Sequence, residues 1–484
     1  DIIARTALWE LAAAFEKGAD VVYTDEDKVS MDLKRHFEPH FKPDFNPDYL
    51  HCVNYICHLV VVKRTLLDKV GLLQGEYDGS QDYDFLLRCT EHTQNIRHIP
   101  KLLYHWRSHE GSTAGNPDDK PYAVIAGEKA LTEHYKRMGI DAVVEYTGNP
   151  VVFRSYFAIK GNPKVSILIP NKDHTADLEK CVTSIMEKST WKNFEIIVIE
   201  NNSEEEETFC YYEELEKRYS EVKVVKWDGP FNYSAINNFG AQYAEGEFLL
   251  LLNNDTEAEP DFLEEMVAAL RRHKKAFSCQ ARMIQLHDRD KMDDAGNYYC
   301  ALGWAFARGK GKDISHYDRE QKIFSTCAGA AIYRKKFIDR IGDFDEEHFA
   351  YLEDLDIGYR ARICGYQNWY APKAKVYHVG SGTSGSRYNQ FKIRYSSRNN
   401  IYLIYKNMPF LQIVLNLPFF LVGFGAKILF FASKGFGREY LAGIKNGFQI
   451  SRKNKKVRFS MRNLPRYIQL QFELWINIFR RFAG

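Results

Sequence analysis

The sequence GEFLLLLNND at residues 246–255 decides the fold. Its apolar run, followed at once by polar residues, is typical of a strand buried on both faces of a parallel sheet. The segments PKVSILIPNKD (163–173) and FEIIVIENNS (194–203) have the same form, and helix-length segments separate the three. Strands that alternate with helices predict an α/β fold with a doubly wound, mostly parallel sheet.

Each of these strands ends in a polar cluster, namely Pro170-Asn171-Lys172, Glu200-Asn201-Asn202-Ser203 and Asn253-Asn254-Asp255. Any one such cluster is also typical of a turn or a helix cap. Open parallel sheets, however, bind ligands at the carboxyl ends of their strands, so three clusters in this order favour a ligand site. We expect the amides and carboxylates to bind a base and a ribose, and Asp255 to hold Mg²⁺ or Mn²⁺ against a diphosphate.

A second group of acids lies in FAYLEDLDIGYRAR, residues 349–362, where Glu353, Asp354 and Asp356 are close in sequence. Like charges in a small region raise the proton affinity of the least solvated one, which can then take a proton from an attacking hydroxyl. Acids that interact with a helix dipole are the alternative. His378 follows the strand AKVY and precedes a glycine-rich turn. It is a candidate metal ligand or phosphate contact, or else a structural residue.

The chain also resembles itself. SQDYDFLLR at 80–88 matches LEDLDIGYR at 352–360. The flanking segments VVVKRTLLDKVG and IPKLLYH match AIYRKKFIDRIG and APKAKVYH in the same order. We therefore expect two copies of one domain type, in which Asp82 and His105 are the first-copy equivalents of the candidate base and the candidate metal-site histidine.

The repeat sets the expected domain boundaries. Aligning ALWELAAAF with DFLEEMVAAL places Asp1 at about Asp255 or Thr256, so we expect the first copy to start partway through the domain. The chain also lacks an initiator Met, which indicates a fragment. The expected parts are a partial domain at 1–116, a helical connector at 117–162, a complete domain at 163–407 and apolar, basic helices at 408–484.

Composition narrows the class of protein. With 45% hydrophobic and 27% charged residues the chain is globular. Its nine scattered cysteines include no C-x-x-C pair, which argues against a disulfide framework or a structural zinc site. The formal net charge is only +2, but the chain after residue 426 has 13 Lys and Arg against 2 Glu.

This basic tail overlaps the apolar run MPFLQIVLNLPFFLVGFGAKILFFAS (408–433) and includes an amphipathic segment at 466–481. We expect helices that lie in a membrane interface, so that the membrane surface is a partner of the C-terminus. A single span or plain core helices are the alternatives. Nucleic acid is not an expected partner, because the aromatic residues of the tail alternate with aliphatic ones.

Together these segments resemble the family-2 glycosyltransferases, in particular the rhamnosyltransferase-like bacterial enzymes of surface-polysaccharide biosynthesis. The resemblance covers 163–407 and is carried by VSILIPNKD, IIVIENNS, FNYSAINNFG, FLLLLNND, FDEEHFAYLEDLDIGYRARICGY, APKAKVYHVGSGTSG and SSRNNIYLIYKN. It implies a GT-A fold, a UDP- or dTDP-sugar donor, a glycan or lipid-linked oligosaccharide acceptor, and transfer with inversion. With the basic tail, it predicts a peripheral protein at the cytoplasmic face of the cell membrane.

The resemblance also implies roles for residues of this chain. The nucleotide-sugar pocket would be formed by Pro170, Lys172, Glu200, Asn201, Asn237, Asn238 and Asn253. Asp255 matches the last acid of the family's D-x-D motif and would bind the metal–diphosphate. Asn253 replaces the first acid, so a weaker metal dependence is expected. Asp354 is the candidate general base, supported by Glu353 and Asp356, and His378 would lie near the metal.

Other functions fit less well. Processive synthases of this family carry Q-x-x-R-W and several membrane spans, whereas the nearest string here, Gln390-Phe-Lys-Ile-Arg394-Tyr395, has a different spacing. A nucleotidyltransferase needs a Gly-rich phosphate loop near its first strand, and VSILIPNKDHTADL has no Gly. A catalytically degenerate scaffold that binds glycan or nucleotide is the main alternative, because the first copy is incomplete and Asn253 replaces an acid.

Overall fold

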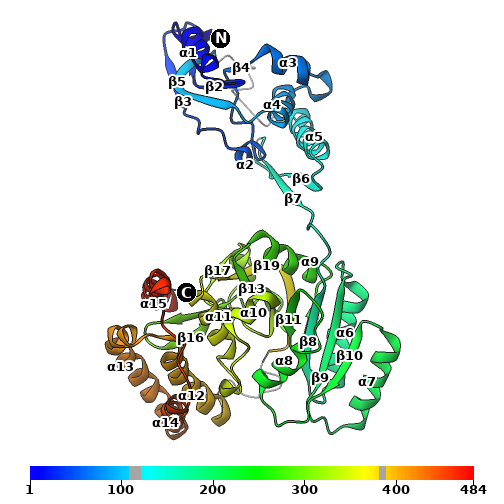
Figure 1. Ribbon diagram of the computed structural model, residues 1–484, viewed down its shortest axis with the longest axis vertical. Helices are drawn as coiled ribbons and strands as arrows, with labels where there is room; N and C mark the ends of the chain where they lie inside the picture. The colour runs from blue at the N-terminus through cyan, green and yellow to red at the C-terminus, as the bar shows by residue number, and fades with distance from the viewer. Residues whose placement is uncertain (108–120, 150, 381–387, 484) are drawn as a thin grey trace. The chain divides into compact units, whose positions relative to one another are not determined.

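The computed structural model describes residues 1–107, 121–149, 151–380 and 388–483 (Figure 1). They form two compact units, Asp1–Lys160 and Gly161–Gly484. The glycine-rich segments at 111–115 and 381–385 lie outside the described residues.

The second unit is built on a sheet whose main strands lie in the order β10-β9-β8-β11-β18-β13-β19-β12. β10, β9, β8 and β11 are parallel, as are β13 and β19, whereas β18 and β12 are antiparallel to their neighbours. The bounds are β8 Val165–Asn171, β9 Phe194–Glu200, β10 Val222–Lys226, β11 Phe248–Leu252, β12 Thr256–Ala258, β13 Ala276–Gln285, β18 Ala330–Arg334 and β19 Gln367–His378. The predicted α/β fold is confirmed, but the sheet is mixed, because antiparallel strands such as β18 and β12 lie beside the parallel ones that were expected to dominate. β8, β9 and β11 end at or beside the three polar clusters.

Helices bury both faces of β11, which explains its unbroken apolar sequence. Leu249 and Leu251 belong to a core that also contains Ile236 of α8 and Ile357 of α11. Phe248, Leu250 and Leu252 alternate with them and are also fully buried. The helices of this region are α6 Thr175–Lys188, α7 Glu206–Arg218, α8 Tyr233–Ala241, α9 Phe262–Arg272, α10 Lys335–Ile341 and α11 Glu353–Ile363.

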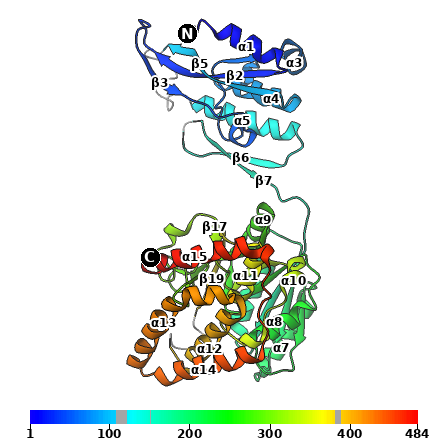
Figure 2. The same ribbon diagram turned by 60° about the vertical axis from the view of Figure 1, so that its left-hand side comes forward.

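The C-terminal helices belong to the same unit (Figure 2). They are α12 Gln390–Asn407, α13 Phe410–Ser433, α14 Gly437–Lys453 and α15 Leu464–Ala483. Phe420, Leu470 and Leu474 from these helices share one core with Leu355 and Tyr359 of α11. Among the described residues α13 alone is long and apolar enough to cross a membrane, by length and composition only.

The first unit has a smaller sheet in the order β1-β5-β2-β3, with β4 paired to β2. β2 and β5 are parallel, and β4 and β1 are antiparallel to their partners. The elements are β1 Ile2–Ile3, α1 Ala7–Glu16, β2 Val21–Val29, β3 His36–His40, α2 Pro47–Leu50, β4 Val60–Val62, α3 Arg64–Val70, α4 Gln81–His92 and β5 Ile96–Arg107.

The segment expected to be a helical connector packs on this first unit. It contains α5 (Pro121–Arg137) and a hairpin of β6 (Ala142–Tyr146) and β7 (Phe153–Phe157). Leu131 and Tyr135 of α5 are buried in one core with Tyr83 of α4. The boundary between the units therefore lies at residue 160, because α5 and the hairpin bury their apolar faces against α4.

Candidate active site

The carboxyl end of β11 and the end of β19 bring Asp255 and His378 together. β12 pairs with β19 so that Thr256 lies opposite His378. The imidazole Nε2 of His378 is 3.2 Å from Oδ1 of Asp255, and its Nδ1 is 2.8 Å from Oδ2 of Asp293. The Asn253 amide nitrogen lies 3.1 Å from the same Nε2. Residues more than a hundred positions apart thus form one cluster.

This cluster is chemically suited to a cation. Burial lowers the pKa of His378, but its hydrogen bonds to Asp255 and Asp293 outweigh burial and raise that pKa to about 9. The imidazole therefore carries a positive charge between two carboxylates in this structure. Carboxylate, amide and neutral imidazole groups are ligands that Mg²⁺ or Mn²⁺ accepts, so Asp255, Asn253 and His378 have the chemistry of a cation site once His378 is deprotonated.

Glu353 and Asp354 start α11 and form a second, carboxylic-acid centre. Oδ2 of Asp354 accepts hydrogen bonds from the Asn297 amide at 3.2 Å and from the Ala328 N–H at 3.3 Å. Burial raises the pKa of Asp354, and burial together with the charge of Asp354 raises the pKa of Glu353. These carboxyl groups therefore bind protons more tightly than ordinary acids, as a general base near neutral pH requires.

The backbone just before α11, which leads into Glu353 and Asp354, is strained. Phe349, Tyr351 and Leu352 have φ values of 65°, 71° and 66°, in the left-handed region that side chains with a Cβ disfavour. The Asn399 amide holds the segment by donating to the carbonyls of His348, Ala350 and Tyr351. Strain of this kind, held by surrounding contacts, is typical of functional sites.

The two centres belong to one electrostatic network, although among the described residues no hydrogen bond joins Asp294 to Asp354. The charge of Asp294 contributes to the raised pKa of Asp354, and Asp294 neighbours Asp293, which contacts His378. Burial raises the pKa of Asp294 to about 6, although the Gln280 amide and the Gly296 N–H donate to its carboxyl group. Asp255, His378 and Asp354 are therefore linked through adjacent acids.

The sequence interpretation did not include Asp293, Asp294 or Asn297. The acids lie on β14 (Met292–Asp294), a short strand that pairs with β13, and Asn297 begins β15 (Asn297–Cys300). The adjacent acids in KMDDAG were a usable signal, because paired buried acids cluster at functional sites. Their distance in sequence from every strand-end cluster concealed the connection.

Asp356 has a different environment from the acids it was expected to support. It is fully buried, 2.8 Å from Arg360 Nε and 2.8 Å from Lys406 Nζ, and it accepts a 2.7 Å hydrogen bond from Asn407. Burial alone would raise the pKa of Asp356, but the two cations hold it well below its usual range. A carboxylate stabilised in this way is a poor proton acceptor, so Asp356 anchors α11 to α12.

The residues expected to bind the nucleotide lie at the ends of β8 and β9. Glu200 is buried; its Oε1 accepts a 2.6 Å hydrogen bond from the Ser203 N–H, and its Oε2 has no partner among the described residues. Asn201 is also buried, while Pro170 is partly exposed and Lys172 pairs with Glu204 at 2.8 Å. A buried carboxylate oxygen without a partner suits a ligand that donates hydrogen bonds, such as a base or a ribose hydroxyl.

The three remaining amides differ from one another. Asn253 lies in the His378 cluster. Asn237, on α8, donates to the Tyr233 carbonyl, and its own amide oxygen is buried without a partner among the described residues. Asn238 donates to the Phe344 carbonyl and accepts from the Phe344 N–H. Asn238 therefore holds the loop before α11 by hydrogen bonds to the Phe344 backbone.

The first-unit residues repeat part of this geometry. Asp82 accepts hydrogen bonds from the Asn54 amide at 3.1 Å and from the Tyr83 N–H at 2.9 Å. His105 Nδ1 contacts Asp27 Oδ1 at 2.5 Å, and His36 contacts the other oxygen of Asp27. These three groups lie close enough together to hold a metal ion. Asp27 belongs to the D-x-D string at 25–27, which lies within β2 and not at a strand end.

Comparison with known proteins identifies the class of domain in the second unit. Residues 166–342 match the family described as Glycosyl transferase family 2. The second unit therefore contains a glycosyltransferase domain. That domain is of family 2; the match includes Asp255, while α11 and His378 follow it in the chain.

The chain is similar to several larger proteins. It is 35% identical over 382 residues to an uncharacterized protein of Sinorhizobium fredii, covering 76% of this chain and 41% of the relative. It is 33% identical over 397 residues to an O-antigen biosynthesis protein of Myxococcus xanthus, covering 79% of this chain and 30% of the relative. The chain thus spans less than half the length of these relatives.

Two further similarities are more distant. An N-acetylglucosaminyl-diphospho-decaprenol L-rhamnosyltransferase of Mycobacterium tuberculosis is 22% identical over 192 residues, covering 35% of this chain and 62% of the relative. A crystal structure of GalNAc-T7 with UDP, GalNAc and Mn²⁺ superposes with a TM-score of 0.43 at 15% identity, covering 52% of this chain and 49% of that chain.

Proposed function

We propose that the second unit transfers a sugar from a UDP- or dTDP-activated donor to a glycan or lipid-linked glycan acceptor, with inversion at the anomeric carbon. The observation that carries this proposal is the contact of His378 with Asp255 and Asp293, beside which Asp294 acts by its charge on Asp354. Such an arrangement supplies a base at one end and a diphosphate-binding centre at the other. The family 2 match supports the reaction class.

In this mechanism Asp354 accepts the proton of the acceptor hydroxyl. The hydroxyl oxygen bonds to the anomeric carbon while the bond from that carbon to the diphosphate breaks on the opposite face. Asp255 and His378 would hold a divalent cation, which neutralises charge on the leaving diphosphate. To act as a ligand, His378 has to release the proton that it shares with Asp255 and Asp293.

The donor would lie against the ends of β8, β9 and β11. Glu200 and Asn201 would bind the nucleoside, and Pro170, Lys172, Asn237 and Asn253 would supply further contacts to the donor. The names of two relatives support an acceptor in polysaccharide assembly, one an O-antigen biosynthesis protein and the other an L-rhamnosyltransferase acting on a diphospho-decaprenol-linked sugar. A deoxyhexose such as rhamnose is the donor sugar that these names favour.

A screen of nucleotide sugars tests this function. We expect release of free UDP or dTDP from one donor, accelerated by a lipid-linked acceptor. The variant Asp255→Asn is expected to lower transfer at least about 10²-fold, because the charge of the leaving diphosphate is no longer offset. Chelation of divalent ions is expected to lower transfer as well. The control is Asp339→Asn, an exposed carboxyl on α10. If calorimetry finds no binding of UDP or dTDP, the chain is a degenerate scaffold and not a transferase.

We also infer that the first unit is the later half of a second domain of the same kind. Ile2 lies opposite His105, as Thr256 lies opposite His378, so Asp1 occupies the position of Asp255. The elements β4, α3, α4 and β5 follow one another as β18, α10, α11 and β19 do. The buried pair Asp84–Arg88 on α4 repeats Asp356–Arg360 on α11, and both arginines donate to carbonyls of the preceding turn.

We further propose that α13 and α15 attach the protein peripherally to an anionic membrane at the cytoplasmic face. Large apolar side chains project from both helices: Leu411 is 77% exposed, Phe472 57% and Phe479 74%. Burial of each such side chain in the interface contributes about 1.5–3 kcal/mol, and the surrounding Lys and Arg attract anionic lipid.

Flotation with phosphatidylglycerol vesicles tests this attachment. The variant Leu411→Glu, Phe472→Glu, Phe479→Glu is expected to reduce vesicle binding at least about tenfold. Leu72→Glu is the matched control, because Leu72 is 74% exposed in the first unit. Point variants are preferred to deletion of α13–α15, whose side chains complete the core around α11. Equal flotation of the triple variant and the control would rule out this attachment.

A further inference from the structure

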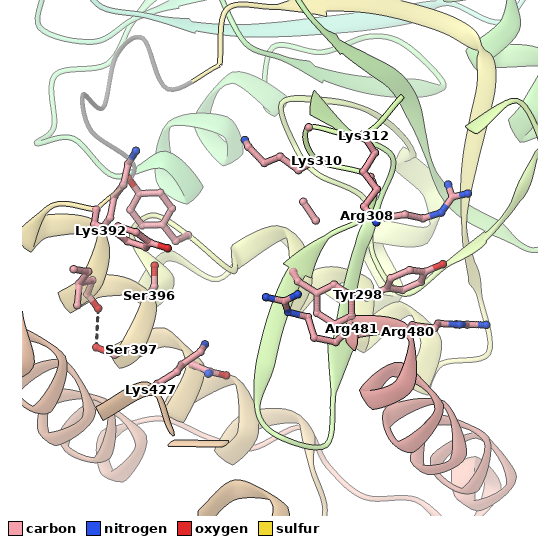
Figure 3. Close-up of a pocket in the computed structure, with 18 of the residues that line it drawn as sticks. Tyr298, Arg308, Lys310, Lys312, Lys392, Ser396, Ser397, Lys427, Arg480 and Arg481 are labelled. Atoms are coloured by element: carbon pink, nitrogen blue, oxygen red, sulfur yellow. Dashed lines mark hydrogen bonds between the residues drawn. The ribbon is translucent and has the colours of Figure 1, made fainter. Parts of the chain in front are cut away.

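A cavity of about 1150 Å³ lies beside the candidate active site in the second unit (Figure 3). Its walls come from the hairpin of β15 and β16 (Trp304–Ala307) with the turn that follows it, and from α12, α13, α14 and the end of α15. Elements far apart in sequence thus enclose it. The catalytic roles proposed above do not use it.

The cavity is strongly basic. Arg308, Lys310 and Lys312 line it from the turn after β16, and Lys392, Lys427, Arg480 and Arg481 line it from the helices. None of the described residues that line it is an Asp or a Glu. Figure 3 shows Lys310, Lys392, Lys427 and Arg481 around one open space.

Like charges face each other across this space. The charge of Lys310 contributes to lowering the pKa of Lys392, although burial is the larger cause. Burial, opposed in part by Cys300 and assisted by the charge of Arg481, lowers the pKa of Lys427 to about 8. Within the described part of the chain, Lys427 and Arg481 form no ion pair with a carboxylate. Side chains on separate helices that repel one another in this way favour an anion between them.

The cavity comes close to the candidate active site at Lys310 and Tyr351. Lys310 lines the cavity and is 3.1 Å from Asp293, which in turn contacts His378 at 2.8 Å. Tyr351 also lines it and comes two residues before Glu353, where α11 begins. The cavity therefore lies beside the candidate base, and no described residue of the β8–β9 end, where the nucleotide is proposed to lie, lines it.

The cavity also borders an apolar surface of α13. Phe431 of α13 lines it, and the preceding Leu429 and Phe430 are 74% and 41% exposed. Tyr298, Tyr317, Tyr388 and Tyr440 add aromatic and hydroxyl groups to the wall, which suit the faces and hydroxyls of sugar rings. The volume is ample for a sugar with two phosphates.

We propose that this cavity binds the diphosphate of a diphosphate-linked glycan acceptor and directs the acceptor sugar toward Asp354. Lys427, Arg481 and Lys312 hold the phosphate oxygens by charge-assisted hydrogen bonds. The lipid or other group beyond the diphosphate leaves along the apolar surface of α13. This inference rests on the proposed transferase function and defines the chemical class of its acceptor.

Calorimetry with geranyl diphosphate, in the presence of saturating UDP, tests the cavity without an activity assay. We expect the wild-type protein to bind this probe and the variant Lys427→Gln, Arg481→Gln to bind it at least about tenfold more weakly, because two charged donors are lost. The matched control is Lys434→Gln, an exposed lysine just after α13 that does not line the cavity. The melting temperature of the double variant is not expected to fall, because the substitution removes a repulsion.

Three results would overturn the proposal. The first is that the double variant binds geranyl diphosphate as tightly as the wild type does, and the second is that the wild type binds geraniol as tightly as geranyl diphosphate. The third is that the double variant no longer binds phosphatidylglycerol vesicles but keeps its affinity for geranyl diphosphate. The last would make the cavity a site for lipid headgroups. In transfer assays the double variant is expected to raise the KM of a diphosphate-linked acceptor at least about tenfold and leave that of the nucleotide sugar unchanged. If no acceptor is glycosylated, the transferase function fails, while the calorimetric result still decides what the cavity binds.

Discussion

Asp354→Asn is expected to lower the rate of sugar transfer by about 10²–10⁴-fold, the range that a positioned general base contributes. The amide cannot accept the proton of the acceptor hydroxyl, yet it keeps the size of the carboxyl group and can still accept hydrogen bonds from Asn297 and the Ala328 N–H. The rate is measured as nucleoside diphosphate released in the presence of acceptor. Binding of UDP or dTDP, measured by calorimetry, is expected to be unchanged.

The pH dependence of transfer gives a second signature of the same base. Only the ionised form of Asp354 accepts a proton, so the rate rises as pH rises through the pKa of this carboxyl. Burial and the charge of Asp294 raise that pKa above the ordinary value of 3.8. As pH is lowered, the rate of transfer is therefore expected to fall well above the pH range in which an exposed aspartate protonates. The residual activity of Asp354→Asn should not show this decrease.

Asp343→Asn is the control for both measurements. Asp343 is exposed and lies ten residues before α11 begins in the same loop. Its substitution removes a carboxylate of similar position without touching the network, so the wild-type rate and pH profile are expected. Wild-type transfer by Asp354→Asn would assign the proton acceptor to another group, such as Glu353.

The central architecture follows from short-range sequence patterns. The run Phe248–Leu252 predicts a doubly buried strand, and the structure buries all five side chains. The ends of β8, β9 and β11 bring their polar clusters to one edge because parallel strands share a direction. The meeting of Asp255 with His378 also agrees with the sequence expectation, since the resemblance places both in one cluster.

Other features depend on contacts that no local pattern encodes. Asp293 and Asp294 join the network only because β14 folds back on β13. In the sequence Asp356 stands only two residues after the candidate base Asp354, so it looks like a second catalytic acid. In the structure Lys406 and Asn407, fifty residues later, hold it as a carboxylate. The apolar sequence of α13 favours a helix in the membrane interface, but it does not show which side chains face the core; in the structure Phe420 packs in the core and Gly423 lies against Leu302. The cavity has no sequence signature, since its cations come from four separate elements.

Asp356→Asn is expected to destabilise the second unit by about 3–5 kcal/mol, the usual cost of removing one partner from a buried ion pair. The substitution leaves Arg360 and Lys406 without the buried carboxylate that lies 2.8 Å from each. Asp345 still pairs with Lys406, and the carbonyls of Ile341 and Gly342 still accept from Arg360, so the unit is expected to fold. Calorimetry should show its melting temperature lowered by about 10 °C.

The dependence of that stability on pH identifies the cause. The pKa of Asp356 is held below its value in the unfolded chain, so the ion pairs stabilise the fold at pH values above the unfolded pKa. This stabilisation is lost as pH falls toward the lowered pKa, and Asp356→Asn should remove that part of the acid sensitivity. Asp84→Asn is the matched variant in the first unit, where Asp84 is equally buried and pairs with Arg88 at 2.9 Å. It is expected to lower the melting transition of the first unit alone. If Asp356→Asn melts like the wild type at neutral pH, these ion pairs do not hold α11 to α12.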